Sequence, residues 1–398
     1  DAAVKTIFLA FAFAYFLSAL LRAVTATLAP AFTAELGLRA GDLGLLAGAY
    51  FFGFAAMQLP LGRALDRFGP RRVLLVLMSL AVVGCAAFAW ADALPGLLAA
   101  RVLIGMGVSA CLMAPLTAYR RLFSPGVQLR ANSWMLMTGS FGMLASTLPV
   151  QWLLPVIGWR GLFVAVAALL ALAMALVLWL VPRDEVPPAA PAAAAAPSGY
   201  AAIVRHPLFL RLLPLGFTLY GGMIAVQSLW AGPWLTRVAG WTPDEAARGL
   251  FAINLSMLLT FLTWGLVMPR LSARGIDALA LVRWGVPVSL ALLAATVALG
   301  AQAGALWWAA WCVSSTCVSL SQPAIGQAFD TAQAGRALSA YNLAIFAGVF
   351  CVQWGIGLAI DALAAAGLGV ERSFQAAFGG FALCCALSYG WFLRRSAP

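Results

Sequence analysis

Charged residues are scarce in this chain: Asp, Glu, Lys and Arg make up 9% of its 398 residues, compared with roughly 25% in soluble domains. Hydrophobic residues make up 64%. This composition excludes an ordinary soluble domain and predicts a membrane protein. The net charge of +11 would indicate a nucleic-acid partner only if the basic residues gathered on one face. They are instead spread from loop to loop, so we expect contact with the lipid bilayer and no binding of nucleic acid.

The sequence also lacks the features of catalytic and metal sites. The single histidine, His206, precedes Pro207, where we expect it to begin a helix rather than to relay protons. The seven cysteines lie inside apolar runs and form neither a disulfide framework nor a metal-binding pair, so we expect them to be small core residues. No glycine-rich phosphate loop and no nucleophile triad is present. We therefore expect a protein that is not an enzyme, with no metal, no cofactor and no ATP-driven step.

Twelve apolar runs are long enough to cross a bilayer, which takes about 20 residues. They lie near residues 7–31, 42–62, 73–92, 95–119, 132–155, 160–181, 208–236, 246–269, 278–299, 304–328, 337–360 and 373–393. An even number of spans puts both termini on one side of the membrane. The fold class predicted from this pattern is an all-α membrane protein with twelve transmembrane helices.

The distribution of basic residues indicates which side that is. Seventeen of the 24 Lys and Arg residues fall in loops on the N-terminal side, and only five fall on the other side: Arg39, Arg160, Arg237, Arg248 and Arg372. Loops rich in Lys and Arg are cytoplasmic. Both termini are therefore predicted to be cytoplasmic, in a protein of the bacterial inner membrane, and the first residues are read as a short cytoplasmic stub.

A change in composition divides the chain into two halves. Residues 183–206 are rich in Ala and Pro with few large apolar groups, which predicts a cytoplasmic linker between bundles of six helices at 1–182 and 207–398. Short echoes recur between the halves at a nearly constant offset, for example Val150-Gln151-Trp152 and Val352-Gln353-Trp354. Parallel repeats of this kind are found in transporters, with the substrate site near the middle of the membrane.

The loop after the second span carries the most specific motif of the chain. It reads Gly-Arg-Ala-Leu-Asp-Arg-Phe-Gly-Pro-Arg-Arg over residues 62–72. The pattern resembles the loop signature of the major facilitator superfamily of transporters. This resemblance implies two pseudo-symmetric six-helix bundles that move a small molecule by alternating access. It also implies a gating group that comprises Gly62, Asp66, Arg67, Gly69, Arg71 and Arg72.

In that family the loop carboxylate, here Asp66, is thought to meet a neighbouring helix N-terminus and nearby Arg side chains when the cytoplasmic side is closed. A carboxylate gains about 0.3–1 kcal/mol at a helix N-terminus, a small bias that suits a switch. Gly62 would allow a close approach and Gly69 a tight turn. The alternative for the arginines of this loop is a plain role in setting topology.

Arg22 lies within the first span, where no loop can accommodate its charge. A charge at the bilayer centre costs roughly 2.5–3.5 kcal/mol or more, so such a residue usually faces a wet cavity. The surrounding run from Tyr15 to Pro30 resembles the first helix of the organic-anion and sugar-phosphate branches of the superfamily, which implies that Arg22 holds the negative group of the substrate. The alternative is a structural ion pair or a hydrogen bond to backbone.

Arg101 lies within the fourth span, and Gly105 follows it by four residues. This spacing resembles the fourth-helix motif of the same family. Arg101 could assist proton movement, or it could have the structural role of bonding carbonyl groups of the first span. Gly105 is expected to permit close packing of helices.

Every one of the thirteen acidic residues falls in a loop or at a helix end. Arg22 and Arg101 then have no obvious counter-ion in the protein, and a cavity with unpaired positive charge selects anions. No carboxylate within the membrane is left to carry a coupling proton. Uniport, exchange, and coupling through a proton that the substrate itself binds all stay open.

Uncharged polar residues in the spans complete the candidate site. They are Tyr50, Gln227, Asn342 and Gln353, joined by Trp230 in a stretch whose composition resembles the broken seventh helix of the family. For each polar residue the alternative is a hydrogen bond between helices.

The predicted function is secondary active or facilitated transport of a small organic anion, in particular a carboxylate, by alternating access, with symport of a proton as one option. One alternative is an exporter of amphipathic drugs or metabolites, and another is a membrane receptor that transports nothing. We expect a monomer.

Overall fold

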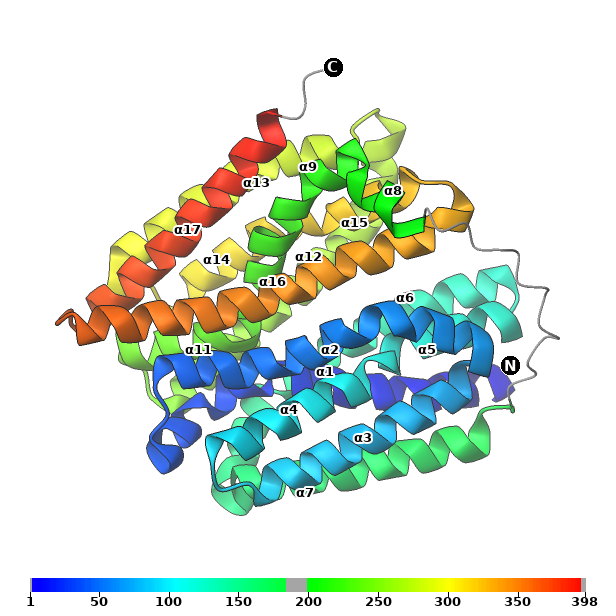
Figure 1. The fold of residues 1–398 in the computed structure, drawn as a ribbon, viewed down its shortest axis with the longest axis horizontal. Coiled ribbons are helices and arrows are strands. Elements are labelled where there is room, and N and C mark those ends of the chain that lie inside the picture. The colour runs from blue at the N-terminus through cyan, green and yellow to red at the C-terminus, as the bar shows by residue number, and fades with distance from the viewer. Residues whose placement is uncertain (1, 184–198, 395–398) are drawn as a thin grey trace. The chain divides into compact units, whose positions relative to one another are not determined.

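The computed structural model describes residues 2–183 and 199–394, and within these ranges every regular element is helical. The helices of the first half are α1 (Ala2–Leu36), α2 (Ala40–Phe68), α3 (Pro70–Trp90), α4 (Leu94–Val108), α5 (Ala110–Leu122), α6 (Pro125–Ala145) and α7 (Leu148–Leu180). The second half contains α8 (Gly199–Arg205), α9 (Pro207–Leu215), η1 (Gly216–Tyr220), α10 (Gly221–Ala225), η2 (Val226–Trp230), α11 (Ala231–Pro233), η3 (Trp234–Val238), α12 (Pro243–Ala273), α13 (Ala278–Leu299), η4 (Gly300–Gln302), α14 (Ala305–Ser315), η5 (Thr316–Leu320), α15 (Ser321–Gln327), α16 (Thr331–Ala365) and α17 (Val370–Arg394) (Figure 1).

These elements form twelve membrane passes, which confirms the predicted fold class. Ten helical stretches of the described residues are each long and apolar enough to span a bilayer. The other two passes are composite: α6 leads into the first part of α7, which breaks at Gly158, and α14, η5 and α15 follow one another directly. All-helical passes are expected here, because in lipid every backbone N–H and C=O must be bonded within its own segment.

Local sequence explains several helix starts. Thr242 and Glu245 form a capping box at the start of α12, and the Asp277 side chain accepts a hydrogen bond from Ala280 at the start of α13. Gly69, with a φ of 84°, separates α2 from α3. Only glycine adopts such a backbone angle at little cost, so the tight turn predicted for this loop is present.

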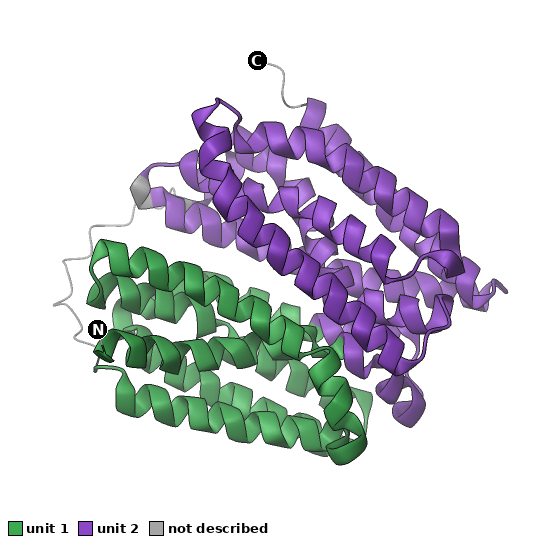
Figure 2. Cartoon of the chain, turned by 180° about the vertical axis from the view of Figure 1, so that it is seen from behind, with its two compact units in different colours: residues 1–25, 49–195 green, residues 26–48, 196–398 purple. Residues whose placement is uncertain are grey.

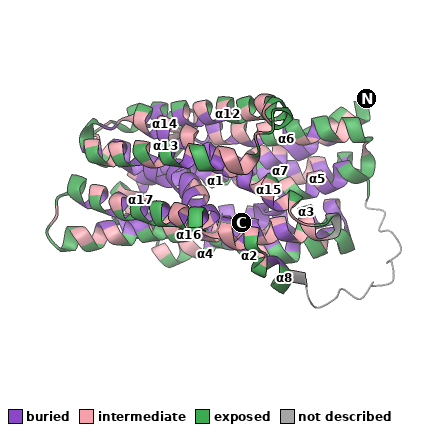
Figure 3. Ribbon diagram, turned by 90° about the horizontal axis from the view of Figure 1, so that it is seen from above, coloured by how far each residue is buried: buried purple, intermediate pink, exposed green. Residues whose placement is uncertain are grey.

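The chain divides into two compact units, coloured separately in Figure 2. Unit 1 comprises residues 1–25 and 49–195, and unit 2 comprises residues 26–48 and 196–398. The C-terminal part of α1 and the N-terminal part of α2 are thus grouped with the second half of the chain. Along the long helices, buried and exposed residues alternate in bands, as expected for helices that pack on one side (Figure 3).

Unit 1 is organised around α3, which packs against α4, α5 and α7 (Figure 1). Phe88 of α3 contacts Phe163 of α7, with ring centroids 4.2 Å apart. Arg160 of α7 donates hydrogen bonds to the carbonyl groups of Ala89 and Ala91 and lies 3.4 Å from a carboxylate oxygen of Asp92. These bonds satisfy carbonyl groups at the end of α3, which have no partner within the helix.

Unit 2 has an aromatic core built mainly from the seventh, tenth and twelfth passes. Trp234 packs edge-on against Trp308 at a centroid distance of 5.1 Å and against Phe378 at 5.2 Å. Trp230 joins the same cluster through Phe374 and Phe378. Such rings contribute large buried areas and hold the three passes together.

A carboxylate of α16 caps the start of α2 within unit 2. Asp361 accepts hydrogen bonds from the backbone N–H groups of Ala40, at 3.2 Å, and Gly41, at 2.8 Å. The first N–H groups of a helix have no partner within it, and the helix dipole favours negative charge there. We call this contact the Asp361 clasp.

One prediction about helix continuity needs correction. The seventh pass is not broken near Trp230, because residues 207–238 stay helical throughout and alternate between α-helical and π-helical turns. Within the predicted linker at 183–206, residues 184–198 lie outside the described part of the chain, and Gly199–Arg205 forms the short helix α8.

Candidate functional site

Arg22 belongs to a polar face of α1 in unit 1. Tyr15, Ser18 and Arg22 are spaced three and four residues apart, which places them on one side of a helix. Tyr15 and Ser18 are buried, whereas Arg22 is half-buried. Arg22, the charge predicted within the first span, therefore packs beside buried residues and is still partly accessible.

The surroundings of Arg22 contain hydroxyl groups and rings but no carboxylate. The hydroxyl groups of Tyr15 and Tyr50 lie beside its guanidinium and interact with it. The guanidinium carbon lies 5.5 Å from the ring centroid of Phe54. The Nε–H of Arg22 has no hydrogen-bond partner among the described residues. A buried donor on a charged group that lacks a partner is costly unless a ligand satisfies it.

Tyr50 of α2 joins Arg22 to Arg101 of α4. Its ring lies under the Arg101 guanidinium at 5.0 Å, and its hydroxyl donates to the carbonyl oxygen of Ser18 at 3.4 Å. Arg101 itself is only 1% exposed and donates through Nη1 to the carbonyl oxygen of Leu21 at 3.0 Å. This is the bond to the first span that the sequence offered as the structural alternative for Arg101.

Gly105 lets α2 and α4 approach closely at this level. A Cβ at residue 105 would lie 1.9 Å from the carbonyl oxygen of Tyr50. No side chain fits there without shifting the backbone of α2. The expected packing role of Gly105 is present, and it fixes the position of Tyr50 beside the two arginines.

Together these residues can hold an anion. A guanidinium offers planar pairs of N–H donors that match a carboxylate. Tyr50 is 0% exposed and its O–H already donates to Ser18, so the structure corrects the prediction that Tyr50 contacts the substrate: it positions Arg22 instead. In the middle of the described spans of unit 1, no acidic side chain competes for Arg22. The arrangement therefore favours a negatively charged ligand over a neutral or cationic one.

In unit 2, three predicted site residues are used for packing. Gln227 donates to the Asn254 side chain at 2.8 Å, and Gln353 donates to Ser228 Oγ at 2.8 Å. Trp230 is 0% exposed and donates to the backbone oxygen of Gln353 at 3.1 Å. The structure thus supports the alternative of hydrogen bonds between helices for Gln227 and Gln353, and it corrects the reading of Trp230 as a residue that lines a pocket.

Asn342 lies in a half-buried polar cluster of the same unit. Its side-chain oxygen accepts a hydrogen bond from Gln322 of α15, and the Gln322 side-chain oxygen accepts one from Tyr220 at 3.1 Å. All three residues are half-buried, so a ligand can still reach them. Asn342 is the predicted unit 2 residue that stays the best candidate for ligand contact.

The residues of the predicted gating group differ in their surroundings. Asp66 is exposed and has no hydrogen bond or ion pair with a described residue. The close approach predicted at Gly62 is wrong, because no heavy atom would lie within 4 Å of a Cβ there. Arg71 donates through Nη2 to the carbonyl oxygen of Leu178 at 2.6 Å and so caps the end of α7. Arg67 and Arg72 are exposed, and Arg67 lies over the neighbouring Phe68 ring.

Sequence reasoning did not single out Tyr15, Tyr220 or Gln322. The signal for Tyr15 was its position seven residues before Arg22, two helical turns away on the same face. Tyr220 and Gln322 come from different passes, so only the packing of the seventh pass against the tenth and eleventh brings them to Asn342. No local pattern could have found that cluster.

Comparisons with known proteins agree with this architecture. A sequence model described as "Major Facilitator Superfamily" matches residues 11–352. A "Probable sulfoacetate transporter SauU" from Cupriavidus necator is 27% identical over 164 residues, which are 39% of this chain and 36% of that protein. A "Probable L-galactonate transporter" from Escherichia coli is 28% identical over 144 residues, which are 34% of this chain and 30% of that protein. The chain therefore spans about a third of the length of these curated relatives.

Solved structures resemble the whole chain. A bacterial homologue of the human lysosomal transporter Spinster, in an inward-facing and unoccupied conformation, has a TM-score of 0.79 at 17% identity, over 100% of this chain and 97% of that one. A D-xylose–proton symporter has a TM-score of 0.76 at 15% identity, over 98% of this chain and 97% of the other. At these identities the likeness concerns the fold.

Proposed function

This chain belongs to the Major Facilitator Superfamily, and from that premise we propose that it moves a small organic anion, in particular a carboxylate, across the membrane by alternating access. The family and the fold make it a multi-pass membrane transporter rather than an enzyme. The nature of the substrate is the part that is proposed.

The observation that carries the proposal is the Arg22 site. A half-buried guanidinium within a membrane pass has one N–H group without a partner and no carboxylate beside it. Charges at this depth are expensive and usually mark a substrate pathway. The two curated relatives support an anion, since sulfoacetate and L-galactonate, the compounds in their names, are both anionic.

We assign Arg22 to the negative group of the substrate. Tyr50 and Tyr15 would hold the Arg22 guanidinium in position through their hydroxyl groups. Within unit 2, Asn342 with Gln322 and Tyr220 offers uncharged donors and acceptors and is a separate candidate for ligand contact. A carboxylate held by a guanidinium fork gains geometric specificity that a point charge would not give.

The coupling mechanism follows from the same charges. Among the described residues, none of the acidic side chains lies in the middle of a membrane pass. A coupling proton would therefore travel on the carboxylate of the substrate, and uniport or exchange would need none. We also propose that the protein works as a monomer in the bacterial inner membrane, with both termini in the cytoplasm.

Counter-flow in proteoliposomes tests the substrate class. Vesicles loaded with unlabelled sulfoacetate or L-galactonate should accumulate the labelled anion transiently, whereas vesicles loaded with neutral D-xylose should not. Repeating the assay with and without a pH gradient separates proton symport from uniport and exchange. If saturable counter-flow occurs only with neutral or cationic amphipathic compounds, the anion proposal fails and the exporter alternative replaces it.

Cysteine labelling tests the orientation. In a variant without the native cysteines, Arg183→Cys lies just after α7, on the side where the termini are proposed to lie. An impermeant maleimide should label it in inside-out vesicles and leave it unlabelled in intact cells. Labelling from outside intact cells would reverse the proposed orientation.

A further inference from the structure

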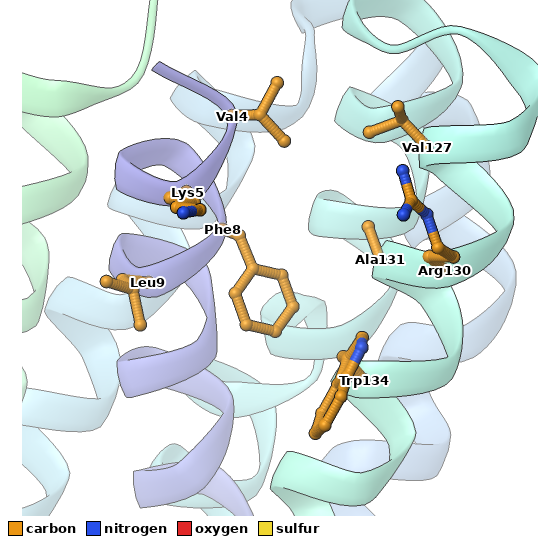
Figure 4. Close-up of a pocket in the computed structure, with 8 residues that line it drawn as sticks. All are labelled: Val4, Lys5, Phe8, Leu9, Val127, Arg130, Ala131 and Trp134. Atoms are coloured by element: carbon orange, nitrogen blue, oxygen red, sulfur yellow. The ribbon is translucent and has the colours of Figure 1, made fainter. Parts of the chain in front are cut away.

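A groove of about 520 Å³ lies between the first turns of α1 and α6 in unit 1. It is lined by Val4, Lys5, Phe8 and Leu9 of α1 and by Val127, Arg130, Ala131 and Trp134 of α6. Figure 4 shows Phe8 extending from α1 into the space between the helices, with Arg130 and Trp134 extending from α6 on the facing side. The volume falls in the usual range for small-molecule sites.

One wall of the groove is held in place by aromatic packing. The Phe8 ring stacks on Tyr119 of α5 at a centroid distance of 6.3 Å, and Tyr119 stacks in turn on Phe123 at 5.0 Å. The Tyr119 hydroxyl also contacts the sulfur of Met135 on α6 at 3.7 Å. The groove is therefore a formed surface between packed helices.

The groove carries two positive charges and no negative one. Lys5 and Arg130 are its only charged lining residues, and neither has a hydrogen bond or ion pair with a described residue. An anion bound there would give both cations a partner.

Each helix repeats the same order of polar and apolar groups. Lys5 precedes Leu9 by four residues, and Arg130 precedes Trp134 by four, so each pair lies on one helical face about 6 Å apart along the axis. Leu9 is 64% exposed and Trp134 is 58% exposed. The groove thus has a cationic end followed by an exposed apolar stretch toward the middle of the pass.

This groove is distinct from the Arg22 site. Lys5 and Arg22 are 17 residues apart on α1, which corresponds to about 25 Å along a helix axis. A small anion held by Arg22 cannot contact Lys5 or Arg130. A ligand bound in the groove would therefore be separate from the transported anion.

We propose that this groove binds an anionic phospholipid. Its phosphate would lie between Lys5 and Arg130, and the first part of an acyl chain would lie on Leu9 and Trp134. Basic pockets between membrane helices on the cytoplasmic side bind anionic head groups, and tryptophan is enriched at the membrane interface. A free phosphate would satisfy the two cations and leave the apolar stretch unused, which is why the lipid fits the groove better.

Binding of phosphatidylglycerol to the full-length protein in detergent micelles tests the proposal, with phosphatidylcholine as the zwitterionic reference and native mass spectrometry as the readout. We expect phosphatidylglycerol to be retained in preference. Lys5→Gln and Arg130→Gln should each weaken retention about fivefold and together about 25-fold. Trp134→Ala should weaken it while leaving the charge unchanged. Arg63→Gln, which removes an exposed arginine of α2 outside the groove, is the matched control and should have no effect.

Charge-conserving variants keep the test decisive if the neutral ones fail to fold. Lys5→Arg and Arg130→Lys should retain the lipid. Equal retention of both lipids, or unchanged retention in the double variant, would overturn the proposal. Displacement of the lipid by millimolar inorganic phosphate, together with no effect of Trp134→Ala, would reduce the groove to a simple anion site and also overturn it. None of these outcomes depends on which substrate is transported.

Discussion

Replacement of Arg22 by alanine should remove most of the affinity for the transported anion. A hydrogen bond to a charged group contributes about 1.5–3 kcal/mol, which corresponds to about 10- to 150-fold in Kd. We expect the loss to lie inside this range and not above it, for two reasons. Arg22 already interacts with the Tyr15 and Tyr50 hydroxyls, so not all of its donors are free for the ligand. It is also half-buried, so water still screens part of the interaction.

The conservative variant separates charge from geometry. Arg22→Lys keeps a positive charge but loses the planar pair of donors. It should recover only part of the affinity, so that its Kd lies between those of the wild type and Arg22→Ala. Equilibrium binding of the labelled anion to purified protein gives the Kd directly, and size-exclusion profiles with melting temperatures show whether each variant is folded.

Arg101→Ala is the matched control for loss of a buried arginine. Because Arg101 bonds the Leu21 carbonyl and packs on Tyr50, its removal should lower the melting temperature and the yield more than it changes Kd. If Arg22→Ala folds and binds the transported anion with unchanged affinity, the reasoning about the Arg22 site is refuted. A neutral or amphipathic substrate would then be the better interpretation.

Three further outcomes are expected. Asp66→Asn should slow counter-flow while Kd stays within a few-fold, because residue 66 is at the membrane surface and too far from Arg22 to touch its ligand; normal turnover would remove the gating role. Gly105→Ala should lower the melting temperature or prevent folding, since its Cβ would lie 1.9 Å from the Tyr50 oxygen, and Gly126→Ala, with no atom within 4 Å, should be tolerated. Asp361→Asn should destabilise the protein by about 1–3 kcal/mol and speed amide exchange at the start of α2; unchanged exchange there would mean that the Asp361 clasp contributes nothing.

The fold could be predicted from the sequence because the membrane imposes it. Apolar runs of the right length must be helical in lipid, and their number and the loop motif at 62–72 indicated the family that the comparisons then showed. The limits of the passes were less predictable. The fifth pass begins at Pro125, before the predicted 132, because the polar stretch around Arg130 is helical although it is not apolar.

The candidate site was predictable in unit 1 and much less so in unit 2. Arg22 and Arg101 stood out because a charge inside an apolar run is costly wherever the helix packs. An amide such as Gln353 gives the same sequence signal whether it faces a ligand or a neighbouring helix. Only the packing of η2 against α16 shows that Gln353 faces a neighbouring helix, where it donates a hydrogen bond to Ser228.

Only one partner in the Asp361 clasp is a side chain. The carboxylate binds backbone N–H groups of residues 40 and 41, and every residue except proline supplies such a group. The contact thus uses no side chain of residues 40 and 41, but residue 41 has to stay glycine, because a Cβ there would lie 2.7 Å from a carboxylate oxygen of Asp361. The acid on α16 cannot be replaced by a compensating change opposite it. A genetic search for suppressors of Asp361→Asn should accordingly yield no exchange of partners at residues 40 and 41, and any suppressors should map to other contacts that hold the start of α2.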